Sequence, residues 1–302
     1  MSLPTRPAIA APGASPHCTK LSLALRRWKR RTFGFIVSVA VLFEALGRAE
    51  PTVAPRRTSG TTADFSAAVN WDFARLPKLD AWRNTAAVIR RTMAQWYPPE
   101  IPGHIIENAS RESLRGFFGN PSKSPASDWS IVYLASHQSR HGRWQFLNEP
   151  AESWADILAG IQCPAKGGRF LVLDVCFAEA ADRDALFHGT GASGILLGAA
   201  HSEEAHEINF QLRFPIDAAR RFPAEARWLR DALGQKWDAR ISFLGFVWLR
   251  AFLATPEAPR STEDWNGFFR LCENLAREFR GGRGAALATT VHFVGRPAVT
   301  LH

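Results

Sequence analysis

The sequence is poor in cysteine. Its four cysteines among 302 residues include Cys18 in the N-terminal segment, which leaves Cys163, Cys176 and Cys272 for the globular part. The sequence contains no Cys-x-x-Cys motif and no Cys/His pair at zinc spacing, so a structural metal site is not expected. Because three is an odd number, at least one of these thiols stays free even if Cys163 and Cys272 form a disulfide.

Long apolar runs, phosphate loops and an evenly spread positive charge are also missing. The uncharged run at residues 33–43 is eleven residues long, whereas a membrane-spanning helix needs about 20 apolar residues. The net charge of +9 belongs mostly to residues 1–49, which hold eight Lys/Arg and one acidic residue, and the remaining chain is at +2. We therefore expect no nucleic-acid partner and no stable membrane span in the globular part.

Residues 1–49 have the pattern of an export signal. A basic segment at residues 26–31 precedes the apolar run, and Gly47-Arg48-Ala49 places small residues at the usual positions for cleavage after Ala49. Arg30-Arg31 resembles a twin-arginine signal. The pattern predicts a periplasmic or secreted protein, and an uncleaved N-terminal membrane anchor or an organellar transit peptide remain the alternatives. Residues 50–64 read as a Pro/Thr/Arg-rich linker, and residues 65–302 as one domain.

Strands and helices alternate along this domain. Apolar runs predict strands at residues 65–71, 104–107, 130–137, 169–176, 192–200 and 289–294. Helical composition, spacing and caps predict helices at residues 81–96, from 110 onward, and at 152–161, 178–186, 222–233, 241–253 and 262–279. This order is typical of an α/β fold with a mainly parallel sheet.

Two of the predicted strands each end in a chemically useful residue. Residues 130–137 form a β-rich apolar run that ends in His137, and residues 169–176 form one of equal length that ends in Cys176. If the two strands are parallel neighbours, both residues leave the sheet at its carboxyl edge, where open α/β sheets build their sites. A thiol beside an imidazole is the minimum apparatus for nucleophilic catalysis. We therefore single out His137 and Cys176 as a catalytic pair.

These motifs resemble the caspase-like clan of cysteine peptidases, which includes caspases, metacaspases, legumains and bacterial relatives. The clan carries its histidine as Ser-His-Gly after one strand and its cysteine as Asp-x-Cys after the next. Ser136-His137 and Asp174-Val175-Cys176 stand in those places. The resemblance spans nearly all of residues 65–295, and its specific part is these two motifs. It implies a caspase-like three-layer sandwich and a cysteine endopeptidase acting on protein or peptide substrates without a cofactor.

The resemblance also implies roles for two further positions. Asp174 occupies the place of the metacaspase aspartate that lines the pocket for a basic residue, so it predicts cleavage after Lys or Arg. Backbone N–H groups near Cys176 and Gln138 would hold the oxyanion. Gln138 departs from the clan's glycine, and its Cβ is expected to restrict the turn. No residue stands out that must orient His137.

Several alternatives stay open. Gln138 favours a caspase-fold protein that has lost turnover and serves as a binding or regulatory module. Asp174 could instead be a strand-end carboxylate satisfied by backbone N–H groups or an arginine. A metal site could be built from His137, His141, His201, His206 and Cys176, although their spacing does not suit a single helix. The oligomeric state and the physiological substrate are not determined by the sequence.

Overall fold

The computed structural model describes residues 61–97, 104–119, 127–163, 168–200, 204–212, 217–234, 239–280 and 288–296. The predicted leader at residues 1–49 and most of the linker lie outside these ranges. β1 (Ala63–Val69) begins two residues before the predicted domain boundary at residue 65. Its Phe65, Ala67 and Val69 are all buried in the core, so the globular part includes the last two residues of the predicted linker.

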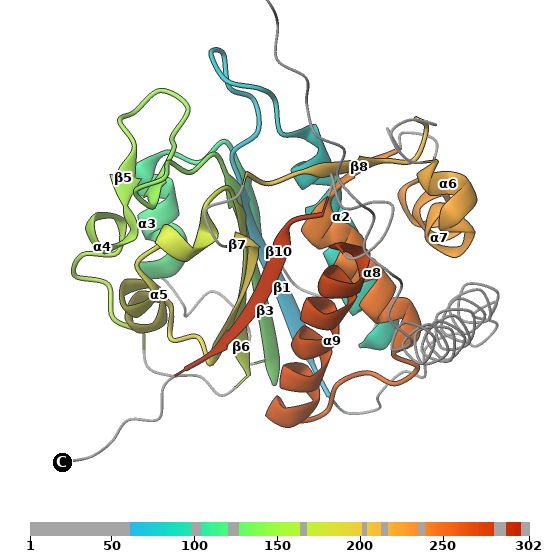
Figure 1. Ribbon diagram of the computed structural model, residues 1–302. Helices are drawn as coiled ribbons and strands as arrows, with labels where there is room; N and C mark the ends of the chain where they lie inside the picture. Colours follow the sequence, from blue (N-terminus) through green and yellow to red (C-terminus); the bar gives the residue numbers. More distant parts are fainter. Residues whose placement is uncertain are drawn as a thin grey trace, which may run out of the picture. The chain divides into compact units, whose positions relative to one another are not determined.

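A six-stranded sheet lies at the centre of the described part, with strand order β10-β7-β6-β3-β1-β2 (Figure 1). Its other members are β2 (Ile105–Glu107), β3 (Trp129–Ser136), β6 (Arg169–Val175), β7 (Gly194–Ala200) and β10 (Thr290–Gly295). The first five strands in chain order run parallel, and β10 at one edge is antiparallel to β7. The prediction of a mainly parallel sheet is thus confirmed.

Helices pack on both faces of the sheet, because β3 and β6 are apolar on both sides. One face, with Phe65, Tyr133 and Phe170, packs against α2 (Asp80–Trp96), α8 (Phe243–Ala254) and α9 (Thr262–Arg280). The other face packs against α3 (Arg111–Gly119), α4 (Trp154–Ile157) and α5 (Arg183–Thr190). The arrangement is a three-layer α/β sandwich (Figure 1).

Short elements lie around the sandwich. Two antiparallel pairs join β4 (Arg143–Trp144) to β5 (Glu152–Ser153) and β8 (Glu207–Asn209) to β9 (Arg240–Ser242). The remaining helices of the described ranges are α6 (Ala218–Arg221), α7 (Pro223–Leu233) and the 3₁₀ turn η2 (Ala178–Ala180). None of the described helices combines the length and the hydropathy that a membrane span requires.

Three predicted helices have different bounds in the structure, and each difference has a local cause. The segment 178–186 divides into η2 and α5 because Ala181 is extended and Asp182 caps a new helix through the Ala185 N–H. The segment 152–161 begins with β5, which pairs with β4, and holds only one turn of helix, capped by Ser153. The segment 241–253 begins in β9, and α8 starts only after its Ser242 cap.

Candidate functional site

His137 and Cys176 follow the ends of two neighbouring parallel strands. β3 pairs with β6 in a register that sets Ser136 opposite Val175. The next residue on each strand is His137 and Cys176, respectively, so both residues leave the sheet at its carboxyl edge, as expected. Both are partly exposed, whereas the strand residues before them are buried. The thiol and the imidazole are therefore the first groups beyond the apolar sheet that solvent reaches.

A backbone carbonyl orients the His137 imidazole. His137 Nε2 lies 2.8 Å from the carbonyl oxygen of Pro77, and the Phe73 ring meets the imidazole edge-on at 4.9 Å between centroids. Since a carbonyl oxygen only accepts hydrogen bonds, Nε2 carries the proton. In the neutral imidazole Nδ1 is then left as the base. The loop after β1 thus supplies the orienting group that the sequence analysis did not find.

The Cys176 thiol lies in a less polar setting. The Ala205 N–H, just before β8, donates to Cys176 Sγ at 3.3 Å. Burial raises the pKa of the Cys176 thiol; the Ala205 N–H opposes this effect, and the carboxylates of Glu204 and Asp174 add to it. The resting thiol is therefore protonated near neutral pH. The structure has no hydrogen bond between Cys176 and His137; the His137 Nε2 is bonded to Pro77 O, and the Cys176 sulfur accepts from Ala205 N–H.

Gln138 adopts an ordinary backbone conformation. It is not among the residues with a positive φ, so the expectation that its Cβ restricts the turn is wrong. It sits opposite Trp144 in an isolated antiparallel bridge, in which His137 O accepts from Gln145 N and Ser139 N donates to Arg143 O. The Gln138 N–H has no acceptor among the described residues, which leaves it available to a ligand.

The Gln138 side chain points inward and contacts the turn after β6. Only 5% of its surface is exposed. Its Nε2 donates to Phe177 O at 3.0 Å and to Cys176 O at 3.3 Å, while its Oε1 accepts from Trp154 Nε1 at 3.4 Å. Phe177 has a φ of 54°, a left-handed conformation that is uncommon for a residue with a Cβ. The turn that carries the thiol is thus strained and bonded to the loop that carries the imidazole.

Asp174 is buried beneath the site rather than lining its surface. Its carboxyl group is 2% exposed and accepts from Tyr133 Oη at 2.8 Å and from Ser242 Oγ at 2.5 Å. Burial raises the pKa of Asp174 to about 6, against the opposing effect of these hydroxyl donors. Gly198 on β7 leaves the room it needs, because a Cβ there would lie 3.2 Å from Asp174 Oδ1. Among the described residues no Lys or Arg pairs with the carboxylate.

The other histidines singled out by the sequence do not join a metal site in the described ranges. His201 lies outside them, and His141 and His206 are exposed. Within the residues that the structure describes, no three His, Cys, Asp or Glu side chains lie close enough together to hold a metal ion.

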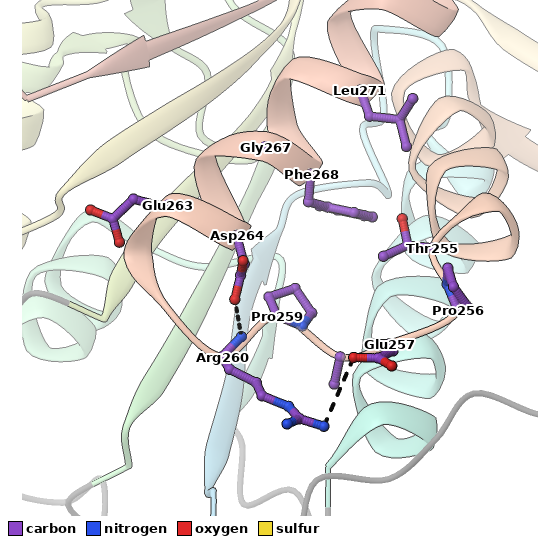
Figure 2. Close-up of a pocket in the computed structure, with 11 residues that line it drawn as sticks. Thr255, Pro256, Glu257, Pro259, Arg260, Glu263, Asp264, Gly267, Phe268 and Leu271 are labelled. Atoms are coloured by element: carbon purple, nitrogen blue, oxygen red, sulfur yellow. Dashed lines mark hydrogen bonds and ion pairs between the residues drawn. The ribbon is translucent and has the colours of Figure 1, made fainter.

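A hollow of the described part lies elsewhere, at the start of α9 (Figure 2). Its volume is about 410 Å³, and it is lined by the segment 255–260 and by the first three turns of α9, including Asp264 and Phe268. This end of α9 packs near the amino ends of β3 and β6, since Trp265 contacts Trp129 and Phe170. The hollow therefore lies at the sheet edge opposite to His137 and Cys176.

Sequence reasoning missed the groups that support the two site residues. Pro77 acts through its carbonyl oxygen, which every residue has, so no sequence pattern marks it. Tyr133 could have been found, because it shares a strand face with Asp174 through the β3–β6 register. Ser242 follows Asp174 by 68 residues and lies in a segment that the sequence analysis predicted as helix, so no sequence pattern pointed to this contact.

A scan against protein-family models finds no family that matches the chain, and a search of curated proteins finds no significant match.

Proposed function

We propose that this chain is a cysteine endopeptidase of the caspase-like clan, with Cys176 as nucleophile and His137 as general base and acid. The observation that carries the proposal is the β3–β6 register, which delivers both residues to the same edge of a parallel sheet. The three-layer α/β arrangement supports the fold that the sequence resemblance implies. The leader-like N-terminal sequence supports export to the periplasm or medium.

The reaction follows from the tautomer of His137. Its Nδ1 takes the proton of the Cys176 thiol, which is needed because burial keeps the pKa of that thiol raised. The thiolate attacks the peptide carbonyl carbon, and the oxygen becomes an oxyanion. When the C–N bond breaks, His137 returns the proton to the leaving amine, and water then hydrolyses the thioester. A closer approach of imidazole and thiol on substrate binding is part of this proposal.

Backbone N–H groups would hold the oxyanion. The Gln138 N–H is available because it faces away from the Trp144 bridge, and the Cys176 N–H lies on the adjacent strand end. Donors fixed in place before reaction stabilise developing negative charge without reorganisation. Glutamine in place of the clan's glycine is thus compatible with an oxyanion site at this position.

The proposal also includes a preference for basic residues before the scissile bond, through Asp174. Asp174 lies two residues before Cys176, on the same strand face, and its carboxylate accepts hydrogen bonds from two neutral hydroxyl groups rather than pairing with a cation. A Lys or Arg side chain that reached it would supply the missing charge. The alternative is that the two hydroxyls simply satisfy a structural carboxylate, which its burial favours.

The second candidate function is a caspase-fold binding protein without turnover. Two observations favour it: the thiol has a raised pKa, and it is not hydrogen-bonded to His137. A peptide ligand would then occupy the same edge without being cleaved.

Labelling with a thiol-reactive peptide probe, together with cleavage of matched fluorogenic peptides ending in Arg, Lys, Asn or Asp, separates these candidates. We expect the probe to label Cys176, and Cys176→Ala to abolish cleavage while Cys272→Ala, at a fully buried thiol in α9, retains it. Peptide binding without labelling or cleavage would favour the second candidate. Cleavage that survives Cys176→Ala would contradict the proposed mechanism.

A further inference from the structure

The loop after β3 and the turn after β6 meet in three places besides the pairing of their strands. The Gln138 amide bonds to the carbonyls of Cys176 and Phe177. The Arg140 guanidinium lies 5.5 Å from the centre of the Phe177 ring. Gly142, at a φ of +70°, comes so close to the turn that a Cβ on it would lie 1.9 Å from Ala180 O. The histidine loop is thus seated directly on the cysteine turn.

Of these contacts, the Gln138 amide has hydrogen-bond partners that fix its orientation. Its two N–H groups face two carbonyl oxygens, and its oxygen faces the indole N–H of Trp154. The opposite orientation of the amide would set oxygen against two oxygens and N–H against N–H. Trp154 is itself fixed, being fully buried against Trp144 with 5.0 Å between ring centroids. The amide therefore acts as a rigid bridge between α4, the histidine loop and the cysteine turn.

The bridge fixes the peptide planes that follow the thiol. Because a trans peptide sets its N–H opposite its C=O, holding the carbonyls of Cys176 and Phe177 on one side directs the N–H groups of Phe177 and Ala178 to the other side. It also supports the left-handed conformation of Phe177, which costs about 1 kcal/mol or more in a residue with a Cβ. Without the amide, the turn loses two hydrogen bonds that stabilise this strained conformation.

We infer that Gln138 is a positioning residue, whose side-chain amide holds the Cys176–Phe177 turn in the conformation that presents the thiol to His137. The inference rests on the proposed function and goes beyond it. The proposed function uses only the backbone N–H of Gln138, whereas the inference gives its side chain a role. The substitution of the clan's glycine is then a functional feature of this chain rather than a sign of lost activity.

Two side-chain variants and a matched control test this role. Gln138→Met keeps an unbranched side chain of similar volume and the backbone N–H, but it removes all three hydrogen bonds. Trp154→Phe removes the donor to the amide oxygen and keeps an aromatic ring at this buried position. The control is Gln145→Met on the same loop, whose side chain bonds to Phe146 O and does not touch the cysteine turn.

The first measurement is steady-state cleavage of a fluorogenic peptide. We expect Gln138→Met to lower kcat by about ten- to a hundredfold, since misplaced reacting groups lower the rate of the chemical step, while KM changes by less than about threefold. Trp154→Phe should lower kcat by a smaller factor, and Gln145→Met should stay within about twofold of the wild type. Equal kcat values for Gln138→Met and the wild type would overturn the inference.

The second measurement is the rate at which iodoacetamide alkylates each cysteine, mapped by peptide mass. A loosened turn exposes the partly buried Cys176, so its alkylation should speed up at least about threefold in Gln138→Met while peptide turnover slows. Cys163 and Cys272 are buried and report global unfolding. Alkylation of all three rising in step would show a merely structural role and overturn the inference.

The two measurements separate the inference from the function on which it rests. A wild-type protein that shows no cleavage and no probe labelling contradicts the proposed peptidase. In that case the alkylation rates still decide whether Gln138 holds the turn: faster labelling confined to Cys176 supports it, and unchanged labelling contradicts it.

Discussion

The amino edge of the central sheet is held by aromatic rings, whereas the carboxyl edge is held by polar side chains and backbone groups. At the amino edge Trp265 contacts Trp96, Trp129 and Phe170 with centroid distances of 5.9 to 6.4 Å. At the carboxyl edge the corresponding contacts are hydrogen bonds, such as His137 to Pro77 and Gln138 to Phe177. One edge is a continuation of the core, and the other presents the side chains of the proposed catalytic pair.

Backbone strain follows the same division. Three of the four described non-glycine residues with a positive φ lie at the carboxyl ends of strands: Asn108 after β2, Phe177 after β6 and Ala199, the second-to-last residue of β7. Such conformations persist only where the surroundings determine them. Burial of aromatic rings stabilises the amino edge, whereas strained backbone collects at the polar carboxyl edge, where the chemistry is proposed.

The largest expected effect comes from removing the base at the carboxyl edge. His137→Ala should lower kcat for peptide cleavage by at least about a thousandfold, because no other group can take the thiol proton in the proposed mechanism. His141→Ala, at an exposed histidine on the same loop, is the matched control and should retain the wild-type kcat. A comparable loss in both variants would mean that the loop as a whole, rather than one imidazole, governs activity.

The amino edge should respond in stability instead. Trp265→Ala removes a fully buried ring from the aromatic cluster, and such truncations lower the free energy of unfolding by about 3–5 kcal/mol. Urea unfolding followed by fluorescence measures this change. Peptide cleavage per folded molecule should stay close to that of the wild type; a selective loss of kcat at full folding would show that the two edges are coupled.

The smallest expected effect is the pH dependence of stability due to Asp174. Burial raises its pKa to about 6 in the folded protein, above the ordinary value of the unfolded chain, so the folded state binds the proton more tightly. Between about pH 4 and pH 6 the unfolded chain loses this proton first, and the free energy of unfolding falls by roughly 3 kcal/mol as pH rises. Above that range this contribution is constant.

Asp174→Asn isolates this effect, because the amide oxygen can still accept from Tyr133 and Ser242. The difference in free energy of unfolding between wild type and variant, measured with urea from pH 4 to pH 7, should shift in favour of the variant as pH rises. Parallel pH profiles would contradict a buried carboxylate with a raised pKa. Cleavage of Arg and Lys peptides by the same variant tests its proposed role in specificity.

The strands that carry the site could be predicted because their continuous apolar sequences indicate burial on both faces. β3 and β6 are continuous apolar runs, so their parallel pairing and the shared exit of His137 and Cys176 followed from the pattern alone. Helix bounds were less predictable where a cap interrupts a helical composition. At Asp182 the preference of a carboxylate for a helix start decided the break between η2 and α5.

The contacts that support His137 and the cysteine turn could not be predicted, for reasons of distance and of chemistry. Pro77 reaches His137 through a backbone oxygen across 60 residues. The orientation of the Gln138 amide depends on Trp154, which reaches it from another element. Residue type alone therefore suggested that Gln138 disfavours the turn. In the structure its side chain instead hydrogen-bonds to the cysteine turn and to Trp154.

The hydrogen bond from Ser242 to Asp174 has a consequence for synthesis of the chain. Ser242 follows Asp174 by 68 residues, which takes several seconds at typical elongation rates of about 5–20 residues per second. During that interval the strand that carries the thiol is already made, but the α8 and α9 helices that cover its face are not. The carboxyl group of Asp174, beneath the thiol, therefore gains its Ser242 donor only after β9 has been made.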